Sequence, residues 1–171
     1  MKIIFLDVDG VLNSDEYFNK IEEKCIDNIK NSIDINTVKK LKKAIDETGA
    51  SVVLSSSWRY SKYYSEYIKQ VFMNYDIVLG QTPLIRKDRG IEIKKWLEEH
   101  PNTEDYVILD DEIFKSFDEE LMKHLIKIGT LDGRGFGEGL QEKDIQEIIL
   151  RLGRKKVHDE KERWNIFDFK N

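Results

Sequence analysis

Apolar residues along this chain occur in short continuous runs that alternate with segments of helical spacing. The runs are Ile3–Val8, Ser51–Ser55, Asp76–Leu79, Tyr106–Leu109 and Leu125–Leu131. Apolar runs of this length are typical of buried strands. The segments that follow them carry apolar residues three or four positions apart, which is the spacing of one helix face. The pattern therefore predicts strands that alternate with helices.

Helical spacing is clearest between the first two runs, where two sets of apolar residues predict two helices. The sets are Phe18, Ile21, Cys25 and Ile29, followed by Ile35, Val38, Leu41 and Ile45. Gly49 stands where the second helix would end. Such alternation, with nearly continuous apolar strands, predicts a parallel sheet of about five strands covered by helices on both faces. The expected fold is a doubly wound, Rossmann-like α/β domain.

The length and charge of the chain bound its organisation and its partners. A chain of 171 residues fits one domain, expected at residues 1–153, with a charged and then aromatic C-terminal tail at residues 154–171. The formal net charge of −5 gives no overall attraction for nucleic acid or anionic membranes. A polyanion would therefore need a local patch or a bound metal. The sequence predicts no particular oligomeric state.

Three features of the sequence bear on the cellular compartment of the protein. No apolar run reaches the roughly 18 residues of a membrane helix, and the first residues lack the features of a signal peptide. The single cysteine, Cys25, has no partner for an internal disulfide and suits a reducing compartment. We therefore expect a cytoplasmic protein that does not span a membrane.

Two aspartates follow the first apolar run with one residue between them. Because successive side chains of a strand alternate faces, Asp7 and Asp9 point the same way, roughly 6–7 Å apart. Two carboxylates this close raise each other's pKa unless a cation lies between them. Gly10 tolerates a positive φ, so the chain can turn away at once and leave both acids exposed. This arrangement predicts a site for something positive.

Polar side chains also follow two of the other runs. Ser55, Ser56 and Ser57 in the segment SSSWR offer hydroxyls and backbone N–H groups suited to phosphate oxygens, and Arg59 could add a bidentate contact. Asp110 and Asp111 in ILDDE form a second acidic pair, and carboxylate sets of this kind favour Mg²⁺. Because parallel sheets place their sites at the carboxyl ends of strands, we expect all these groups at one edge of the sheet.

Taken together, these motifs resemble the haloacid dehalogenase (HAD) superfamily of aspartate-nucleophile phosphatases. The likeness rests on Asp7-Val-Asp9-Gly10, a hydroxyl after a second strand and an aspartate pair after a later strand. More narrowly, the segments FLDVDGVLNS, VVLSSSWR, RGIEIKKWL and YVILDDE are similar to the HAD domain of Swiss Army Knife RNA repair proteins. The resemblance extends over about residues 3 to 150 and implies a HAD-like core.

The resemblance implies a catalytic role for both aspartates of the first pair. Asp7 would be the nucleophile that takes the phosphoryl group, and Asp9 the acid that protonates the leaving group and later activates water. Ser55 would bind the transferred phosphoryl group, with Ser56 in its place if the register shifts by one residue. Gly10 would also belong to the phosphate-binding residues.

The resemblance also implies a cation and a basic side chain. Asp110 and Asp111 would complete a Mg²⁺ site with the Asp7 carboxylate and the Asp9 backbone carbonyl. A basic residue would neutralise the phosphoryl group, and the sequence offers Arg89, then Lys87 and Arg86. The family more often has lysine at this position. Because a phosphate monoester repels Asp7, both positive charges are needed before in-line attack.

Substrate size follows from the room between the motifs. The stretches between them are filled by helices and strands of the expected sheet, so there is little or no cap, and an open site suits an RNA or DNA end or a nucleotide. The segment WRYSKYYSEY adds aromatic faces that could stack on bases, although about half must face the core at helical spacing. These residues are Trp58, Tyr60, Tyr63, Tyr64 and Tyr67.

Three alternative functions share some of these features. A noncatalytic module of the same fold could grip nucleic-acid ends, and a phosphatase of small metabolites could use the same residues. A phosphotransfer receiver domain also has acidic strand ends, but its phosphorylated aspartate follows a later strand, whereas the Asp7 and Asp9 pair comes first here. The expected function is therefore Mg²⁺-dependent hydrolysis of a phosphate monoester.

Overall fold

The structure is a computed structural model that describes residues 1–21, 28–85, 88–129 and 137–153. Within these residues the chain forms one five-stranded sheet, all parallel, in the order β3-β2-β1-β4-β5. The strands are β1 (Lys2–Leu6), β2 (Ser51–Leu54), β3 (Leu79–Gln81), β4 (Asp105–Asp110) and β5 (Leu125–Lys127). The predicted parallel α/β fold is confirmed.

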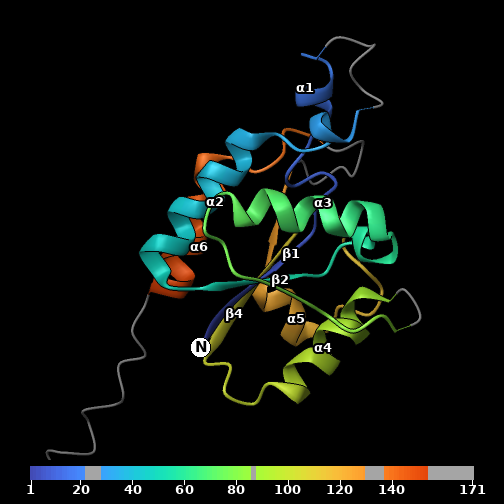
Figure 1. The fold of residues 1–171 in the computed structure, drawn as a ribbon. Helices are drawn as coiled ribbons and strands as arrows, with labels where there is room; N and C mark the ends of the chain where they lie inside the picture. Colours follow the sequence, from blue (N-terminus) through green and yellow to red (C-terminus); the bar gives the residue numbers. More distant parts are fainter. Residues whose placement is uncertain (22–27, 86–87, 130–136, 154–171) are drawn as a thin grey trace, which may run out of the picture.

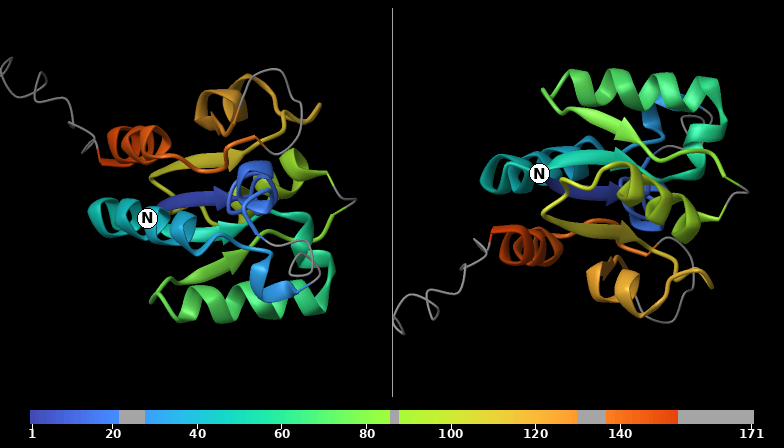
Figure 2. Two further views of the ribbon diagram at one scale, coloured as in Figure 1. Left: turned by 90° about the horizontal axis from the view of Figure 1, so that it is seen from above. Right: turned by 90° about the horizontal axis from the view of Figure 1, so that it is seen from below.

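Helices cover both faces of this sheet (Figure 1). One face carries α2 (Ile35–Thr48), α3 (Lys62–Met73) and α6 (Glu142–Gly153), and the other carries α4 (Arg89–Glu99) and α5 (Glu119–His124). Figure 2 shows the two faces in turn. Three shorter elements lie in the connections: α1 (Asp15–Phe18), η2 (Ile29–Asn31) and η3 (Ser57–Tyr60). The described residues between the strands therefore contain no separate cap domain.

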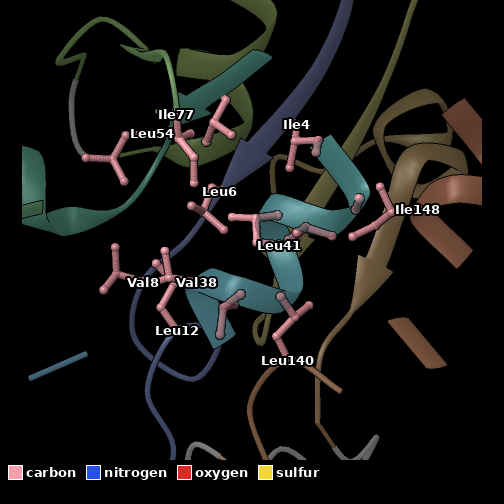
Figure 3. Close-up of a cluster of buried hydrophobic side chains, with 14 of the residues drawn as sticks. Ile4, Leu6, Val8, Leu12, Val38, Leu41, Leu54, Ile77, Leu140 and Ile148 are labelled. Carbon is pink, nitrogen blue, oxygen red and sulfur yellow. The ribbon is translucent and has the colours of Figure 1, made fainter. Parts of the chain in front are cut away.

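Helix α2 shows how the sequence determines an element and its packing. The Asp34 side chain accepts from the Asn36 N–H at 2.8 Å and starts the helix, while Gly49 ends it with a φ of 68°. Val38 and Leu41 then face the sheet and are fully buried against strand residues, as Figure 3 shows. Burial of this apolar face holds the helix on the sheet.

Alternation along β1 supplies apolar residues to both layers. Ile4 and Leu6 belong to the cluster under α2, α3 and α6, whereas Ile3 and Phe5 belong to the cluster under α4 and α5. The Phe5 ring meets the Trp96 ring of α4 edge-on, with centroids 5.3 Å apart. A strand that is buried on both faces reads as a continuous apolar run, which is why β1 is easily predicted.

The strand order places a topological switch between β1 and β4. The chain leaves β1 toward the face that carries α2 and reaches β4 from the face that carries α4. The loops after these two neighbouring strands therefore diverge and leave a crevice at the carboxyl edge of the sheet, which is the usual position of ligands in such folds.

Three predicted elements differ from the structure or fall partly outside it. The third strand was expected at Asp76–Leu79 but is Leu79–Gln81, because Asp76 has a φ of 53° and turns the chain at the end of α3. The fifth strand is shorter than expected, and 130–136 lie outside the described residues. The predicted helix through Cys25 falls largely on 22–27, which are also outside, as is the tail at 154–171.

A membrane span is not supported by any described helix. None of the helices in the described ranges combines the length with the apolar character that crossing a bilayer needs.

Candidate active site

The register of the sheet brings three polar residues to one place. Leu6 of β1 pairs with Leu54 of β2 on one side and with Leu109 of β4 on the other. The next residues along these strands are Asp7, Ser55 and Asp110. Backbone hydrogen bonds continue one step further, because the Asp7 N–H donates to the Leu109 carbonyl and the Ser55 N–H to the Leu6 carbonyl, both at 2.9 Å.

Asp7 lines a cavity of about 490 Å³, but only 5% of its surface is exposed, so the prediction that the turn leaves both aspartates exposed is wrong for Asp7. Its Oδ1 accepts from the Val8 N–H at 2.8 Å, and its Oδ2 pairs with Arg89 at 2.7 Å. Asp9, Ser55 and Asp111 line the same cavity. The groups that the sequence placed at three strand ends are therefore gathered around one carboxylate.

Asp9 is held by two side chains that donate to its two oxygens. The Trp58 indole N–H donates to Oδ2 and the Asn13 amide to Oδ1, each at 3.0 Å. Burial raises the pKa of Asp9 and the nearby charge of Asp7 adds to this, while the two hydrogen bonds partly oppose the rise. A raised pKa favours the protonated form that an acid catalyst needs.

Gly10 allows the turn after these aspartates for two separate reasons. Its φ is +73°, a conformation that other residues adopt at a cost. A Cβ at this position would also lie 2.8 Å from the Asp111 Cβ and closer still to the carboxyl group of Asp111. Glycine is therefore required for the Asp111 side chain to occupy its place.

Three carboxylates meet at the switch point between β1 and β4. One oxygen from each of Asp7, Asp110 and Asp111 lies within 4.8 Å of the others, which is close enough for one metal ion. Burial raises the pKa of Asp110, and the Asp7 charge adds to the rise. The same two causes, in the same order, raise the pKa of Asp111 to about 6. Without a cation this cluster is electrostatically unfavourable.

Arg89 supplies a positive charge to this cluster. It is the first residue of α4, which begins with the Asp88 side chain accepting from the Ile91 N–H at 3.3 Å. The same guanidinium nitrogen pairs with Asp7 and with Asp110. Burial alone would lower the pKa of Arg89, but these two carboxylates outweigh burial and raise it. The two alternatives, Arg86 and Lys87, lie outside the described residues.

The two serine candidates have different surroundings. Ser55 is 1% exposed and lines the cavity, and its Oγ has no hydrogen-bond partner among the described residues. Ser56 is also buried, but its Oγ accepts from the Trp58 N–H at 3.3 Å and starts η3. A buried hydroxyl without a partner is uncommon and indicates a binding position. Of these two serines, Ser55 is therefore the one whose hydroxyl has no partner among the described residues.

The phosphate contact expected of Arg59 has no donor left to make it. A guanidinium has five N–H groups, and in Arg59 all of them are used within the protein. The acceptors are the carbonyls of Ser55, Ser56, Thr82 and Pro83 and the carboxylate of Glu92. Arg59 therefore ties the loop after β2 to α4 and to the loop after β3, and we leave it out of the phosphate site.

The aromatic residues after β2 differ in their burial and in their hydrogen-bond partners. Trp58 is buried against Asp9, and the Tyr67 hydroxyl donates to the Lys30 carbonyl at 3.1 Å. The Tyr60 hydroxyl donates to Glu92 at 2.6 Å. Tyr63 and Tyr64 are 63% and 40% exposed on α3. The segment therefore combines core, positioning and surface residues.

The sequence analysis did not identify two residues that contribute to the site. Asn13 is buried, its Oδ1 accepts from the Gly10 N–H at 2.9 Å, and its amide holds Asp9. Its position three residues after a turn glycine was the available signal, because asparagine side chains commonly bond nearby backbone in turns. Glu92 pairs with Arg59 across 33 residues, and no local pattern indicates such a contact.

Comparison with known proteins shows the family of the chain. The sequence matches the family described as the HAD domain in Swiss Army Knife RNA repair proteins over residues 3–144. Searches of curated proteins and of solved structures each gave no match. The matched range contains all the residues of the site described above. The resemblance drawn from the sequence is confirmed, and the chain belongs to the family of HAD domains found in Swiss Army Knife RNA repair proteins.

Proposed function

We propose that this chain is a Mg²⁺-dependent phosphatase that hydrolyses phosphate monoesters through a phosphorylated Asp7. The observation that carries the proposal is the pair formed by Asp7 and Ser55 in one cavity. Asp7 is a buried carboxylate charge-paired with Arg89, and the Ser55 hydroxyl beside it is buried with no hydrogen-bond partner among the residues that the structure describes. A phosphoryl oxygen would accept from this hydroxyl and remove the cost of leaving it unsatisfied.

In the first half of the reaction, an Asp7 carboxylate oxygen attacks phosphorus in line with the leaving oxygen. The bond between phosphorus and Asp7 forms as the bond to the leaving oxygen breaks, and Asp9 donates a proton to that oxygen. Arg89 balances the charge that Asp7 and the phosphoryl group share. The raised pKa of Asp9 supports its role as the acid.

In the second half, Asp9 is ionised and acts as a base. It takes a proton from a water molecule, whose oxygen attacks the phosphorus of phosphorylated Asp7. The bond between phosphorus and the Asp7 oxygen breaks, so inorganic phosphate leaves and both carboxyl groups return to their starting states. Trp58 and Asn13 hold the Asp9 oxygens in place during both steps.

The residues present fit a Mg²⁺ ion. Asp7, Asp110 and Asp111 offer three clustered carboxylate oxygens, the ligand type that Mg²⁺ prefers. Two of these acids have raised pKa values, and a bound cation would lower them by favouring the ionised carboxylates. The Asp9 backbone carbonyl is a fourth candidate ligand. When bound, Mg²⁺ supplies positive charge that offsets the repulsion between Asp7 and the phosphate ester.

For the substrate, we propose a phosphate at the end of RNA or DNA, or on a nucleotide. Two features support this choice. The family description concerns RNA repair proteins, and the described connections contain no cap domain that would exclude a large substrate.

The test is turnover of an aryl phosphate with Mg²⁺ by the wild type and three variants. We expect Asp7→Asn to abolish turnover, because the nucleophile is lost, and Asp9→Asn to slow it by about 10²- to 10⁴-fold. Asp46→Asn removes the same charge from an exposed position on α2 and should leave the rate unchanged. An inactive wild type would favour the noncatalytic binding module.

A substrate panel then separates the remaining alternatives. It comprises oligonucleotides with 3′- or 5′-phosphates, nucleotides and sugar phosphates, compared by kcat/KM. We expect the oligonucleotides or nucleotides to be preferred. Turnover of sugar phosphates alone would overturn the proposed substrate and favour a small-metabolite phosphatase.

A further inference from the structure

A second cavity of about 430 Å³ adjoins the catalytic cavity. Asp9, Ser57 and Tyr60 line both, so the two cavities are direct neighbours, whereas Asp7 is among the lining residues of the catalytic cavity and not of the second one. In the proposed reaction the phosphoryl group is on Asp7 and the leaving oxygen is at Asp9. The second cavity therefore lies on the side to which the leaving group of the substrate must extend.

The walls of this cavity combine aromatic rings with small hydrogen-bonding groups. Phe18, Trp58, Tyr60 and Tyr64 contribute rings, and the Trp58 and Tyr64 centroids lie 4.8 Å apart. Serine and asparagine side chains make up the rest of the described lining apart from Asp9. No lysine or arginine is among the described residues of this lining. Within this described lining, a second phosphate would therefore meet one carboxylate and no cation.

We propose that this cavity is the leaving-group subsite and that it binds the nucleoside that carries the scissile phosphate. This inference rests on the proposed function and adds the substrate class and the residues that select it. A nucleobase is flat and uncharged and has polar edges, which suits aromatic walls interspersed with hydroxyl and amide groups. The cavity volume also falls within the range of small-molecule sites, about 300–1,000 Å³.

Tyr64 is the residue that tests the subsite most cleanly. Trp58 donates a hydrogen bond to Asp9, and Tyr60 donates one to Glu92. Substitution of either residue would therefore also remove a hydrogen bond outside the proposed nucleoside contact. Tyr64 is 40% exposed and lines the cavity, whereas its neighbour Tyr63 is 63% exposed and is not among the lining residues. The two tyrosines therefore form a matched pair for substitution on one helix.

The experiment measures kcat/KM for adenosine 3′- and 5′-phosphates and for ethyl phosphate. The quantity compared between variants is the kcat/KM of each adenosine phosphate divided by that of ethyl phosphate. We expect Tyr64→Ala to lower the ratio by about tenfold, because base stacking is lost. Tyr64→Phe keeps the ring and should restore the ratio, and Tyr63→Ala should leave it at the wild-type value. An unchanged ratio in Tyr64→Ala, or an equal fall in both alanine variants, would overturn the inference.

A binding measurement separates this inference from the proposed function. Adenosine without phosphate is titrated while tryptophan fluorescence is recorded, with ribose as the control ligand. We expect adenosine to quench the fluorescence in the wild type and in Trp96→Phe but much less in Trp58→Phe, since Trp96 lies in the core on the opposite face of the sheet. Quenching without any phosphatase activity would support the cavity and contradict the reaction. Phosphatase activity without adenosine binding would do the reverse.

Discussion

At the scale of single residues, two glycines have nearly the same backbone conformation and very different surroundings. Gly10 has a φ of +73° and Gly49 a φ of +68°, so a side chain at either would incur the strain of the left-handed region. A Cβ at Gly49 would meet nothing within 4 Å, whereas at Gly10 it would overlap Asp111. Substitutions at the two glycines therefore distinguish the effect of backbone strain, which both share, from the displacement of Asp111, which occurs at Gly10.

We expect Gly49→Ala to lower the free energy of unfolding by about 1 kcal/mol without changing Mg²⁺ affinity. Gly10→Ala should cost at least as much stability and also weaken Mg²⁺ binding by tenfold or more, because Asp111 is displaced. Urea unfolding and calorimetric titration of Mg²⁺ measure the two effects. Wild-type Mg²⁺ affinity in a folded Gly10→Ala protein would contradict the assignment of Asp111 as a ligand.

Arg89 contacts its two carboxylates in a way that a lysine could reproduce. One guanidinium nitrogen pairs with both Asp7 and Asp110, so the bidentate fork of arginine is not spread across the two acids. The positive charge at this point matters more than the shape of the group that carries it.

Arg89→Lys should therefore retain kcat within about tenfold of the wild type, while Arg89→Met should lose about 10²- to 10³-fold, the usual effect of removing one electrostatic contact to a reacting group. Steady-state kinetics with an aryl phosphate measures both, and circular dichroism checks that each variant is folded. Equal loss in the two folded variants would contradict the role given to the charge.

At the scale of elements, the segment η3 and the helix α4 are held together by a buried ion pair. Arg59 of η3 pairs with Glu92 of α4 at 2.6 Å, and both side chains are almost completely buried. Glu92 also accepts from the Tyr60 hydroxyl and from the Ile85 N–H. These contacts fix the segment that follows Ser55 relative to the helix that begins with Arg89.

We expect Glu92→Gln to lower the free energy of unfolding by about 3 kcal/mol, because a buried guanidinium would be left without its counter-charge. The matched control is Glu66→Gln, which removes the carboxylate of an exposed pair with Lys62 and should cost less than about 0.5 kcal/mol. Urea unfolding of both variants gives the comparison. A cost for Glu92→Gln no larger than that of the control would show that the pair does not hold these elements.

How well each element could be predicted depended on how much of it is buried. Strand β1 is buried on both faces and was predicted to within two residues, whereas β3 lies at the sheet edge and contains Gly80 and Gln81, which have little strand preference. Helix α5 has six residues, too few for a clear period, and was not located from the sequence. The local pattern of apolar residues therefore predicts the elements that are buried in the core better than those at its edge.

The site was predictable to the same degree. Asp7, Asp110 and Ser55 follow from strand ends and register, which the sequence order determines. The role of Arg59 did not follow, because Glu92 and the carbonyls that it contacts approach only after the fold forms. Asp9 was predicted, but its Trp58 partner is 49 residues away. Contacts between residues that are far apart in the sequence could not be predicted from the sequence alone.

At the scale of the whole molecule, the acidic cluster links stability to pH and to metal. The pKa values of Asp110 and Asp111 are raised in the folded state, that of Asp111 to about 6. The folded protein therefore binds protons more tightly than the unfolded chain at these sites. Unless a cation is bound, the folded state gains stability as the pH falls from 8 toward 6.

We expect the melting temperature of the metal-free protein to rise as the pH is lowered from 8 to about 5.5. The acids with lowered pKa values titrate below this window and should not reverse the trend, for example Asp118 and Glu120. Because Mg²⁺ competes with protons for the cluster, it should raise the melting temperature more at pH 8 than at pH 5.5. Thermal unfolding with and without Mg²⁺ measures both trends. An equal Mg²⁺ effect at both pH values would contradict a metal site in this cluster.

The most direct measurement of the central claim is a crystal structure of the chain grown with Mg²⁺ and beryllium fluoride, which mimics a phosphoryl group bonded to a carboxylate. The account predicts beryllium bonded to an Asp7 oxygen, a fluoride within hydrogen-bond distance of the Ser55 hydroxyl, and Mg²⁺ held in the cluster of Asp7, Asp110 and Asp111. Beryllium fluoride bound to another carboxylate, or Asp7 still paired only with Arg89 in the presence of both reagents, would contradict it.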